Sequence, residues 1–370
     1  MKIESLEIRA CKVNNEVAST DALAGVKRPD GLEFLVYTMT LESGDKVSTF
    51  GFAGSSAEGS AIMGKASLEP FFKGRSVFDR EALWHDFKKH DRYWAHLPIY
   101  MYGPADICLW LMAAELAEQP LYKYLGAFRD QVPVYCSSMF METAEDYVTE
   151  ALDVQSKGYK AYKLHPPGKS IDEDLEIHAA VRQAVGSGFN LMSDPVSLMS
   201  LPDALRYGRG LEALDFRWFE EPMGDDSYHT LRELTRQLDI PVVGTEVLAK
   251  HPYTVAECIA TKVVDVVRAD VSWTGGVTGT MKTATTAEAF NVNCEIHTAI
   301  FHPLELVNLH LCAAVRNCTY LELLWPKDQF GFGLVEDLPI ENGIAKLPQK
   351  PGMGIDLDWA LIDNSTLSVH

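Results

Sequence analysis

Three acidic residues recur along the chain at one fixed interval. Asp194, Glu220 and Glu246 are 26 residues apart, and each ends a short apolar run that reads as a β-strand. If the three strands are neighbours, the carboxylates converge and repel each other unless a cation neutralises them. Ligation by oxygen alone, without Cys or His, suits Mg2+ rather than zinc. The spacing predicts a magnesium site, against the simpler interpretation that the three residues are solvent-facing strand caps.

Glu221 directly follows Glu220, so the middle ligand has two candidates. Adjacent residues of a strand point to opposite faces, and both therefore cannot line the same site. We predict that Glu220 is the ligand.

Other apolar runs also end in charged or proton-transferring groups. Lys163 and His165 lie in AYKLHP, Asp270 ends VVRAD, His297 ends NCEIH and Glu322 lies in TYLEL. His297 is the predicted base, because Asp270 can accept its ring N–H and raise its basicity. Lys163 would add a second positive charge near the predicted magnesium site. Glu322, if neighbouring carboxylates hold it protonated, could donate a hydrogen bond from the far side of the predicted site. The alternative is that Glu322 is a buried carboxylate paired with a Lys or Arg of the barrel described below.

Lys163 and His165 are two residues apart, and their side chains therefore share one strand face. Three roles remain open for His165: a second acid or base, a residue that binds a substrate hydroxyl, or a structural histidine.

Strand-like and helix-like patterns alternate strictly after Gly126. Eight short β-rich runs are separated by seven helical stretches. Strict alternation implies parallel strands with right-handed crossovers, and eight such strands close a barrel whose active site lies at the strand ends. The predicted helices span 143–157, 171–185, 202–214, 228–238, 254–260, 276–290 and 303–315.

The first 126 residues have a different pattern. Three runs (3–13, 32–43 and 46–54) alternate like the strands of an antiparallel meander, and 60–126 is mostly helical. We predict a first domain over 1–126 and a barrel domain over 127–324, with 325–370 an irregular tail that returns to the first domain. Two polar loops, 18–31 with Lys27 and Arg28 and the small-residue loop 54–60, connect the early elements.

The motifs together resemble the enolase superfamily, and within it the mandelate racemase subgroup. The resemblance rests on GPADICLWLMAAELAEQPLYKYLG in the first domain and on GYKAYKLH, SDP, WFEEP, GTE, RADVSWTGGVTG and EIH in the barrel. It implies an N-terminal α+β capping domain over a (β/α)7β modified TIM barrel. It also implies one Mg2+ that binds a substrate carboxylate while a base removes the proton alpha to it.

The resemblance is weakest at the second barrel strand. The subgroup's usual Lys-x-Lys is here Lys163-Leu164-His165, which puts two-base racemisation in doubt more than proton abstraction. By resemblance, the two loops of the first domain close over the barrel mouth. Lys27 and Arg28 would then bind the distal carboxylate of a diacid, or they are solvated loop charges.

Three functions compete. In an acid-sugar dehydratase, a hydro-lyase, His297 removes the C2 proton and an acid expels the C3 hydroxide, giving a 2-keto-3-deoxy acid from an aldonate or aldarate. In a racemase or epimerase of a 2-hydroxy or amino acid, His297 and His165 act on opposite faces. The third is an inactive metal-binding homologue. We prefer dehydration because a single base suffices for this elimination and because the resemblance points to dehydratases. Muconate-type cycloisomerisation is disfavoured, because it would leave the His297–Asp270 pair unexplained.

Composition limits the partners. The chain has 52 acidic and 33 basic residues, a net charge of -19, which argues against nucleic acid and anionic membranes. Seven cysteines without a CxxC pair indicate reduced thiols. The N-terminus lacks an apolar signal core and no apolar run approaches 18 residues, so we expect a cytoplasmic protein. A small carboxylate substrate is the expected partner, and a homo-oligomer is implied by the resemblance alone.

Overall fold

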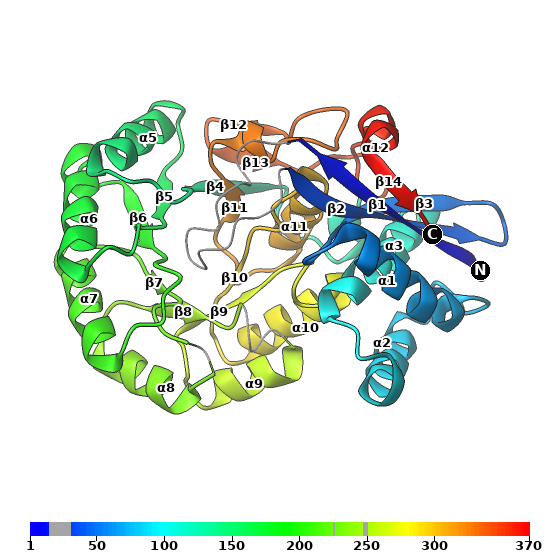
Figure 1. Ribbon diagram of the computed structural model, residues 1–370, viewed down its shortest axis with the longest axis horizontal. Coiled ribbons are helices and arrows are strands. Elements are labelled where there is room, and N and C mark those ends of the chain that lie inside the picture. The colour runs from blue at the N-terminus through cyan, green and yellow to red at the C-terminus, as the bar shows by residue number, and fades with distance from the viewer. Residues whose placement is uncertain (15–30, 225, 247–250) are drawn as a thin grey trace.

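The computed structural model describes residues 1–14, 31–224, 226–246 and 251–370, and its larger part is a barrel of parallel strands (Figure 1). From β4 to β10, each strand pairs in parallel with the next strand in the chain, and β11 pairs in parallel with β4. The predicted (β/α)7β architecture is confirmed. The strands are β4 (Gln131–Ser137), β5 (Ala161–Leu164), β6 (Asn190–Ser193), β7 (Phe219–Glu220), β8 (Val242–Gly244), β9 (Val266–Ala269), β10 (Cys294–Ile296) and β11 (Leu321–Leu324).

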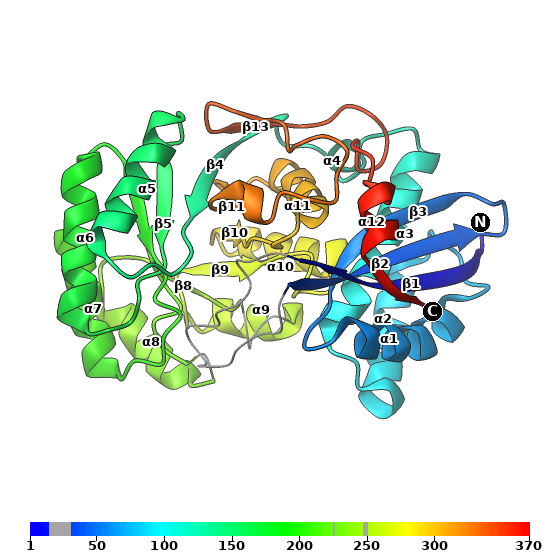
Figure 2. The same ribbon diagram turned by 45° about the horizontal axis from the view of Figure 1, so that its top comes forward.

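Seven helices connect these strands in the described chain, and α5 to α8 form the outer wall on the side away from the first domain (Figures 1 and 2). Three of the helices begin at hydroxyl caps: the side chains of Thr143, Ser170 and Ser200 each accept a backbone N–H three residues later. The helices are α5 (Ala144–Ser156), α6 (Ile171–Val185), α7 (Leu201–Ala213), α8 (Tyr228–Gln237), α9 (Pro252–Ala260), α10 (Gly276–Ala289) and α11 (His302–Ala314).

An apolar layer fills the barrel interior below the strand ends. It consists of Tyr135, Ala161, Met192, Trp218, Val243 and Tyr320. Because side chains repeat every two residues on one face of a strand, the residues two positions further along point into the same interior. Four of these are Lys163, Asp194, Glu220 and Glu322. The barrel interior is therefore apolar below the strand ends and lined by charged side chains near the carboxyl ends of the strands.

The first domain is built on an antiparallel sheet in the order β14-β1-β2-β3. Helix α3 packs along β3, and it is buried over most of its length because it also packs on the barrel helix α10. The strands are β1 (Ile3–Val13), β2 (Leu32–Leu41), β3 (Lys46–Phe52) and β14 (Thr366–Val369); the helices are α1 (Ala57–Phe72), α2 (Arg80–His90), the π-helical turn η2 (Asp91–Ala95), α3 (Ile99–Leu116) and α4 (Leu121–Tyr124).

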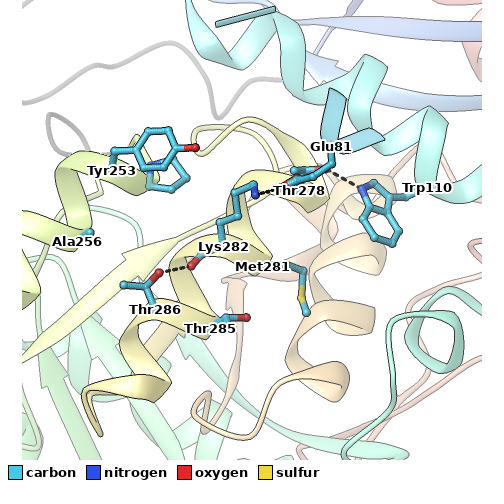
Figure 3. Close-up of a pocket in the computed structure, with 10 residues that line it drawn as sticks. Glu81, Trp110, Tyr253, Ala256, Thr278, Met281, Lys282, Thr285 and Thr286 are labelled. Atoms are coloured by element: carbon cyan, nitrogen blue, oxygen red, sulfur yellow. Dashed lines mark hydrogen bonds and ion pairs between the residues drawn. The ribbon is translucent and has the colours of Figure 1, made fainter. Parts of the chain in front are cut away.

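Polar contacts join the first domain to α10 beside a groove of about 450 Å3 (Figure 3). The indole N–H of Trp110 in α3 donates to the hydroxyl of Thr278 at 2.8 Å. Lys282 pairs with Glu81 of α2 beside the same groove. These contacts fix α10, and with it the loop that precedes α10, against the first domain.

Two expectations about irregular segments need correction. The predicted loop 54–60 is only half irregular, because the Ser56 hydroxyl accepts the N–H of Gly59 and starts helix α1. The tail, predicted to be irregular, contains a short 3-10 turn, η3 (Lys327–Gln329), strands β12 (Ile340–Glu341) and β13 (Ile344–Lys346), helix α12 (Trp359–Ser365) and β14. Its strand β13 pairs with β4 of the barrel, and only its end, β14, joins the sheet of the first domain. The boundaries at 126 and 324 stay a prediction.

Two further observations concern the cysteines and the helices. All seven cysteines are buried and unpaired. Within the described ranges, no helix has both the length and the apolar character needed to cross a membrane.

Candidate active site

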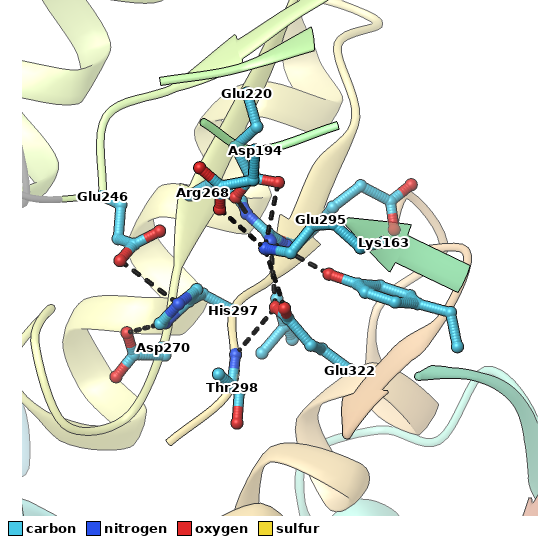
Figure 4. A network of polar contacts seen from close by, with 12 residues as sticks. Lys163, Asp194, Glu220, Glu246, Arg268, Asp270, Glu295, His297, Thr298 and Glu322 are labelled. Carbon is cyan, nitrogen blue, oxygen red and sulfur yellow. Dashed lines mark hydrogen bonds and ion pairs between the residues drawn. The ribbon is translucent and has the colours of Figure 1, made fainter. Parts of the chain in front are cut away.

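The polar residues singled out from the barrel sequence lie around the carboxyl ends of its strands (Figure 4). Lys163 is in β5 and Glu322 in β11, Glu220 ends β7, and Asp270 and His297 directly follow β9 and β10. Because all these strands are parallel, their carboxyl ends open at the same mouth.

Lys163 is the centre of a buried ionic network. Its ammonium lies 3.0 Å from Asp194, 3.2 Å from Glu220 and 2.8 Å from Glu322. The lysine side chain is fully buried. Burial by itself would lower its pKa, but the carboxylates of Glu220 and Glu322 raise the pKa well above the usual value. Lys163 is therefore a buried cation.

Arg268 is a second buried cation that the sequence reasoning missed. Its Nε donates to Glu220 at 2.6 Å, and its Nη2 donates to Glu322 and to the Tyr135 hydroxyl, both at 2.9 Å. The side chain has no exposed surface. A signal was present in VVRAD, because Arg268 lies two residues before Asp270 in an otherwise apolar strand and therefore points to the same face.

Glu322 does not match the expectation of a protonated acid. Burial alone would raise its pKa, but Lys163 and Arg268 lower it well below the usual value. Its Oε2 also accepts the backbone N–H of Thr298 at 3.1 Å. The alternative interpretation, a buried Glu paired with barrel cations, agrees with these contacts.

His297 lies between two carboxylates. Its Nδ1 is 3.3 Å from Asp270 Oδ2, and its Nε2 is 3.2 Å from Glu246 Oε1. The other oxygen of Asp270 accepts the N–H groups of Ser272 (2.6 Å) and Trp273 (2.8 Å), which fixes the orientation of this carboxylate. An Nδ1–H donated to Asp270 leaves Nε2 as the nitrogen that can accept a proton.

His165 contacts a different part of the cluster. Its Nδ1 lies 2.6 Å from the Ser138 carbonyl oxygen and its Nε2 lies 3.1 Å from Asp194 Oδ2. The ring of Phe140 packs at 5.5 Å between centroids. The structure thus places His165 and His297 on different carboxylates of the same mouth.

The three predicted magnesium ligands do not form a ready-made cage. In the described parts of the chain, no group of three acidic, histidine or cysteine side chains could hold a metal ion as it stands. Glu246 is turned to His297, whereas Asp194 and Glu220 share Lys163. Both oxygens of Glu220 already accept hydrogen bonds, Oε1 from Arg268 and Oε2 from Lys163 and Trp218.

The electrostatics of the same residues favour a cation. Burial, and then repulsion from Glu221 and Glu220, raise the pKa of Glu246 well above its usual value. Asp194 differs, because Lys163 and His165 outweigh its burial and lower its pKa. An all-oxygen donor set with uncompensated repulsion fits a hard divalent cation such as Mg2+.

Two predicted substrate-binding residues, Lys27 and Arg28, lie outside the described residues.

Glu221, the other candidate for the middle metal ligand, accepts the backbone N–H of Glu246 through its side chain at 3.2 Å. It has a positive φ of 39°, so its backbone has already left the strand geometry at this point.

Comparisons with known proteins agree with this architecture. Residues 146–361 match the family described as "Enolase C-terminal domain-like". An arabinonate dehydratase of Saccharolobus solfataricus is 30% identical over 254 residues, 67% of each chain. A 3,6-anhydro-alpha-L-galactonate cycloisomerase of Streptomyces coelicolor is 27% identical over 338 residues, 89% of this chain and 90% of the relative.

A solved structure resembles the whole chain. D-glucarate dehydratase from Agrobacterium tumefaciens, complexed with magnesium, has a TM-score of 0.89, 32% identity and coverage of 100% of both chains. The chain belongs to the enolase superfamily, as its motifs indicated, and its fold is that superfamily's barrel with an N-terminal capping domain.

Proposed function

We propose that this protein is a hydro-lyase that removes water from a sugar acid, an aldonate or aldarate, and releases a 2-keto-3-deoxy acid. The observation that carries the proposal is the His297–Asp270 pair, which places an oriented imidazole beside a cluster of buried carboxylates and cations. The superfamily assignment and the sugar-acid dehydratases among the relatives support the same reaction class.

Mg2+ is the proposed cofactor, held by Asp194, Glu220 and Glu246. When bound, it would withdraw electron density from the substrate carboxylate and make the adjacent C–H more acidic. The support is the donor chemistry of the three residues and the magnesium in the related glucarate dehydratase structure.

The other side chains of the site have separate roles in the proposed reaction. Lys163 supplies a fixed positive charge in a buried setting, where it stabilises negative charge developing on the substrate carboxylate. His297 takes the C2 proton at Nε2, while Asp270 holds the ring through Nδ1. The electron pair of the broken C–H bond forms the C2–C3 double bond, and the C3 hydroxide departs with a proton as water. The resulting enol becomes the 2-keto acid.

His165 and Glu322 have supporting roles in this proposal. His165 binds a substrate hydroxyl or gives the departing hydroxide its proton, since it directly follows β5 and its Nε2 lies 3.1 Å from Asp194. Glu322 holds Lys163 and Arg268 in place as an ionised partner. Lys27 and Arg28 are proposed to bind a distal carboxylate.

The test is turnover of a panel of mono- and diacid sugars, D-glucarate and arabinonate included, with Mg2+ present. A 2-keto product detected with a carbonyl reagent is the expected result. If no acid of the panel gives a 2-keto product, the dehydratase proposal fails.

A racemase or epimerase is the second candidate, because His165 gives the mouth a second histidine besides His297. Such an enzyme would exchange the alpha hydrogen with D2O without losing water. An anhydro-sugar acid belongs in the same panel, because one relative is a cycloisomerase.

A further inference from the structure

Helix α11 carries two buried polar side chains behind the proposed base. Glu305 and Asn308 are 1% and 0% exposed, and they are three residues apart and therefore on one face of the helix. A polar group buried this deeply costs free energy unless it is hydrogen-bonded.

Asn308 connects the two chain segments that carry the base and its partner. Its Nδ2 donates to the backbone carbonyl of His297 at 2.9 Å. Its Oδ1 accepts the backbone N–H of Val271, the residue after Asp270, at 3.3 Å. One amide side chain therefore bridges β9 and β10 where both strands have just ended.

Glu305 holds the loop that follows His297. Its Oε1 accepts the Thr298 hydroxyl and, at 2.9 Å, the N–H of Ile300. Ile300 is β-branched and has a φ of 72°, a strained conformation that persists only where the surroundings enforce it. Thr298 in turn donates its N–H to Glu322.

We propose that Asn308 is a positioning residue that sets the geometry of the His297–Asp270 pair, and that Glu305 supports it by holding residues 298–300. The inference rests on the proposed function in one respect, the assignment of His297 as the base. Asn308 has both a donor and an acceptor to offer, and it uses one on each strand end. A side chain without these groups would lose the hydrogen bonds to both the His297 carbonyl and the Val271 N–H, and neither strand end would be held by it.

Asn317 is a matched control. It is also a buried amide, and its Nδ2 donates to two backbone carbonyls, those of Ala284 (3.1 Å) and Val292 (3.0 Å). Its contacts join α10 to the segment before β10 and do not reach His297 or Asp270. Asn308→Ala and Asn317→Ala therefore remove similar interactions at different places.

The kinetic test compares these two variants, with the acid found by the panel and Mg2+ at saturation. Asn308→Ala should lower kcat at least about tenfold with KM within about twofold, because a small displacement of a reacting group lowers the rate steeply. The deuterium isotope effect on kcat, with substrate deuterated at C2, should rise as proton removal becomes slower. A kcat loss below twofold, or an equal loss in Asn317→Ala, would overturn the inference.

A crystallographic test does not depend on activity. In Asn308→Ala, the distance between His297 Nδ1 and Asp270 Oδ2, 3.3 Å here, should lengthen by about 1 Å, and Asn317→Ala should leave it unchanged. If the wild type turns over no acid, the proposed function fails while this comparison still decides the inference, since an unchanged pair refutes it. If Asn308→Ala does not fold, Asn308→Ser replaces it in both tests.

Discussion

At the scale of single residues, the described part of the barrel mouth sets two cations, Lys163 and Arg268, against five carboxylates, those of Asp194, Glu220, Glu246, Asp270 and Glu322. Lys163 and Arg268 pair with Glu220 and Glu322, and Lys163 also pairs with Asp194, whereas Glu246 contacts His297. If all five carboxylates are ionised, three negative charges remain uncompensated, and one Mg2+ would neutralise two of them. This balance gives the metal proposal a test that needs no substrate.

Mg2+ should stabilise the folded protein, because an ion that binds the native state alone raises its unfolding temperature. Thermal unfolding with and without MgCl2 measures the effect. Asp194→Asn, Glu220→Gln and Glu246→Gln should each abolish the rise, whereas Glu221→Gln should retain it. A rise that survives Glu220→Gln and disappears in Glu221→Gln would reverse our choice of ligand.

The base assignment predicts a large kinetic effect. His297→Asn keeps the approximate shape but removes the proton acceptor, so dehydration should fall at least about 100-fold. Asp270→Asn should also lower the rate of dehydration, because the imidazole of His297 loses the carboxylate that orients it. His165→Asn separates the two histidines: if His165 binds a hydroxyl only, this variant still exchanges the C2 hydrogen with D2O. Full dehydratase activity in His297→Asn would refute the assignment.

We expect that substitution of Arg268 lowers the free energy of unfolding, because its role is structural. Arg268→Met leaves Glu220 and Glu322 buried with one cation fewer, and breaking a buried pair from one side costs about 3–5 kcal/mol of unfolding free energy. Urea unfolding measures this loss. Arg236→Met is the control, because Arg236 pairs with Glu233 on the exposed face of α8 and its loss should have no measurable effect. Equal midpoints for both variants would contradict the structural role of Arg268.

At the scale of elements, the capping helix α3 lies directly on the loop that begins with Asp270. A Cβ added at Gly103 would come within 2.8 Å of the Val271 carbonyl oxygen and 3.1 Å of the Gly276 nitrogen. Both neighbours are backbone atoms, which cannot rotate away as a side chain can. The first domain therefore contacts the backbone that positions the proposed catalytic pair.

Gly103→Ala should consequently affect both stability and activity. Overpacking of this kind costs about 1–3 kcal/mol, and the displaced loop should lower kcat in the dehydration assay. Gly188→Ala is the matched control, because a Cβ at Gly188 meets no atom within 4 Å. Unchanged unfolding and kinetics in Gly103→Ala would show that the contact yields without displacing the loop.

At the scale of the whole molecule, His310 ties three parts of the chain together. It lies in α11 of the barrel, its Nδ1 accepts the N–H of Tyr122 in α4 at 3.1 Å, and its Nε2 lies 2.9 Å from the carbonyl oxygen of Met353 in the tail. One nitrogen accepts and the other donates, so this arrangement requires the neutral ring. Burial lowers the pKa of His310 to about 4.

This histidine should make stability depend on pH. Between about pH 6.5 and pH 4 the unfolded chain binds a proton at His310 that the folded chain excludes, so stability present above this window is lost as the pH falls. The loss between pH 7 and pH 5 is about 2 kcal/mol. Urea unfolding of His310→Gln should show a pH dependence smaller by this amount, and replacement of the exposed His85 on α2 should not change it. Identical slopes for wild type and His310→Gln would contradict the prediction.

The sequence by itself determined the order of the barrel elements and most of the residues at its mouth, Arg268 excepted. Alternating apolar runs and helical periods are local properties, so each strand and helix could be predicted within its own segment. The polar ends of the runs pointed to Asp194, Glu220, Glu246, Asp270 and His297 in the same way. Their proposed roles await the tests above.

Only the tertiary structure decided which charges meet. Lys163 reaches Asp194 across 31 positions of the chain, and Arg268 reaches Tyr135 across 133. Such contacts depend on how the strands are arranged around the barrel and on side-chain torsions chosen by mutual burial, and neither is a local property. For the same reason the sequence left two interpretations of Glu322 open, because the cations that lower its pKa come from β5 and β9 and only the fold brings them to it.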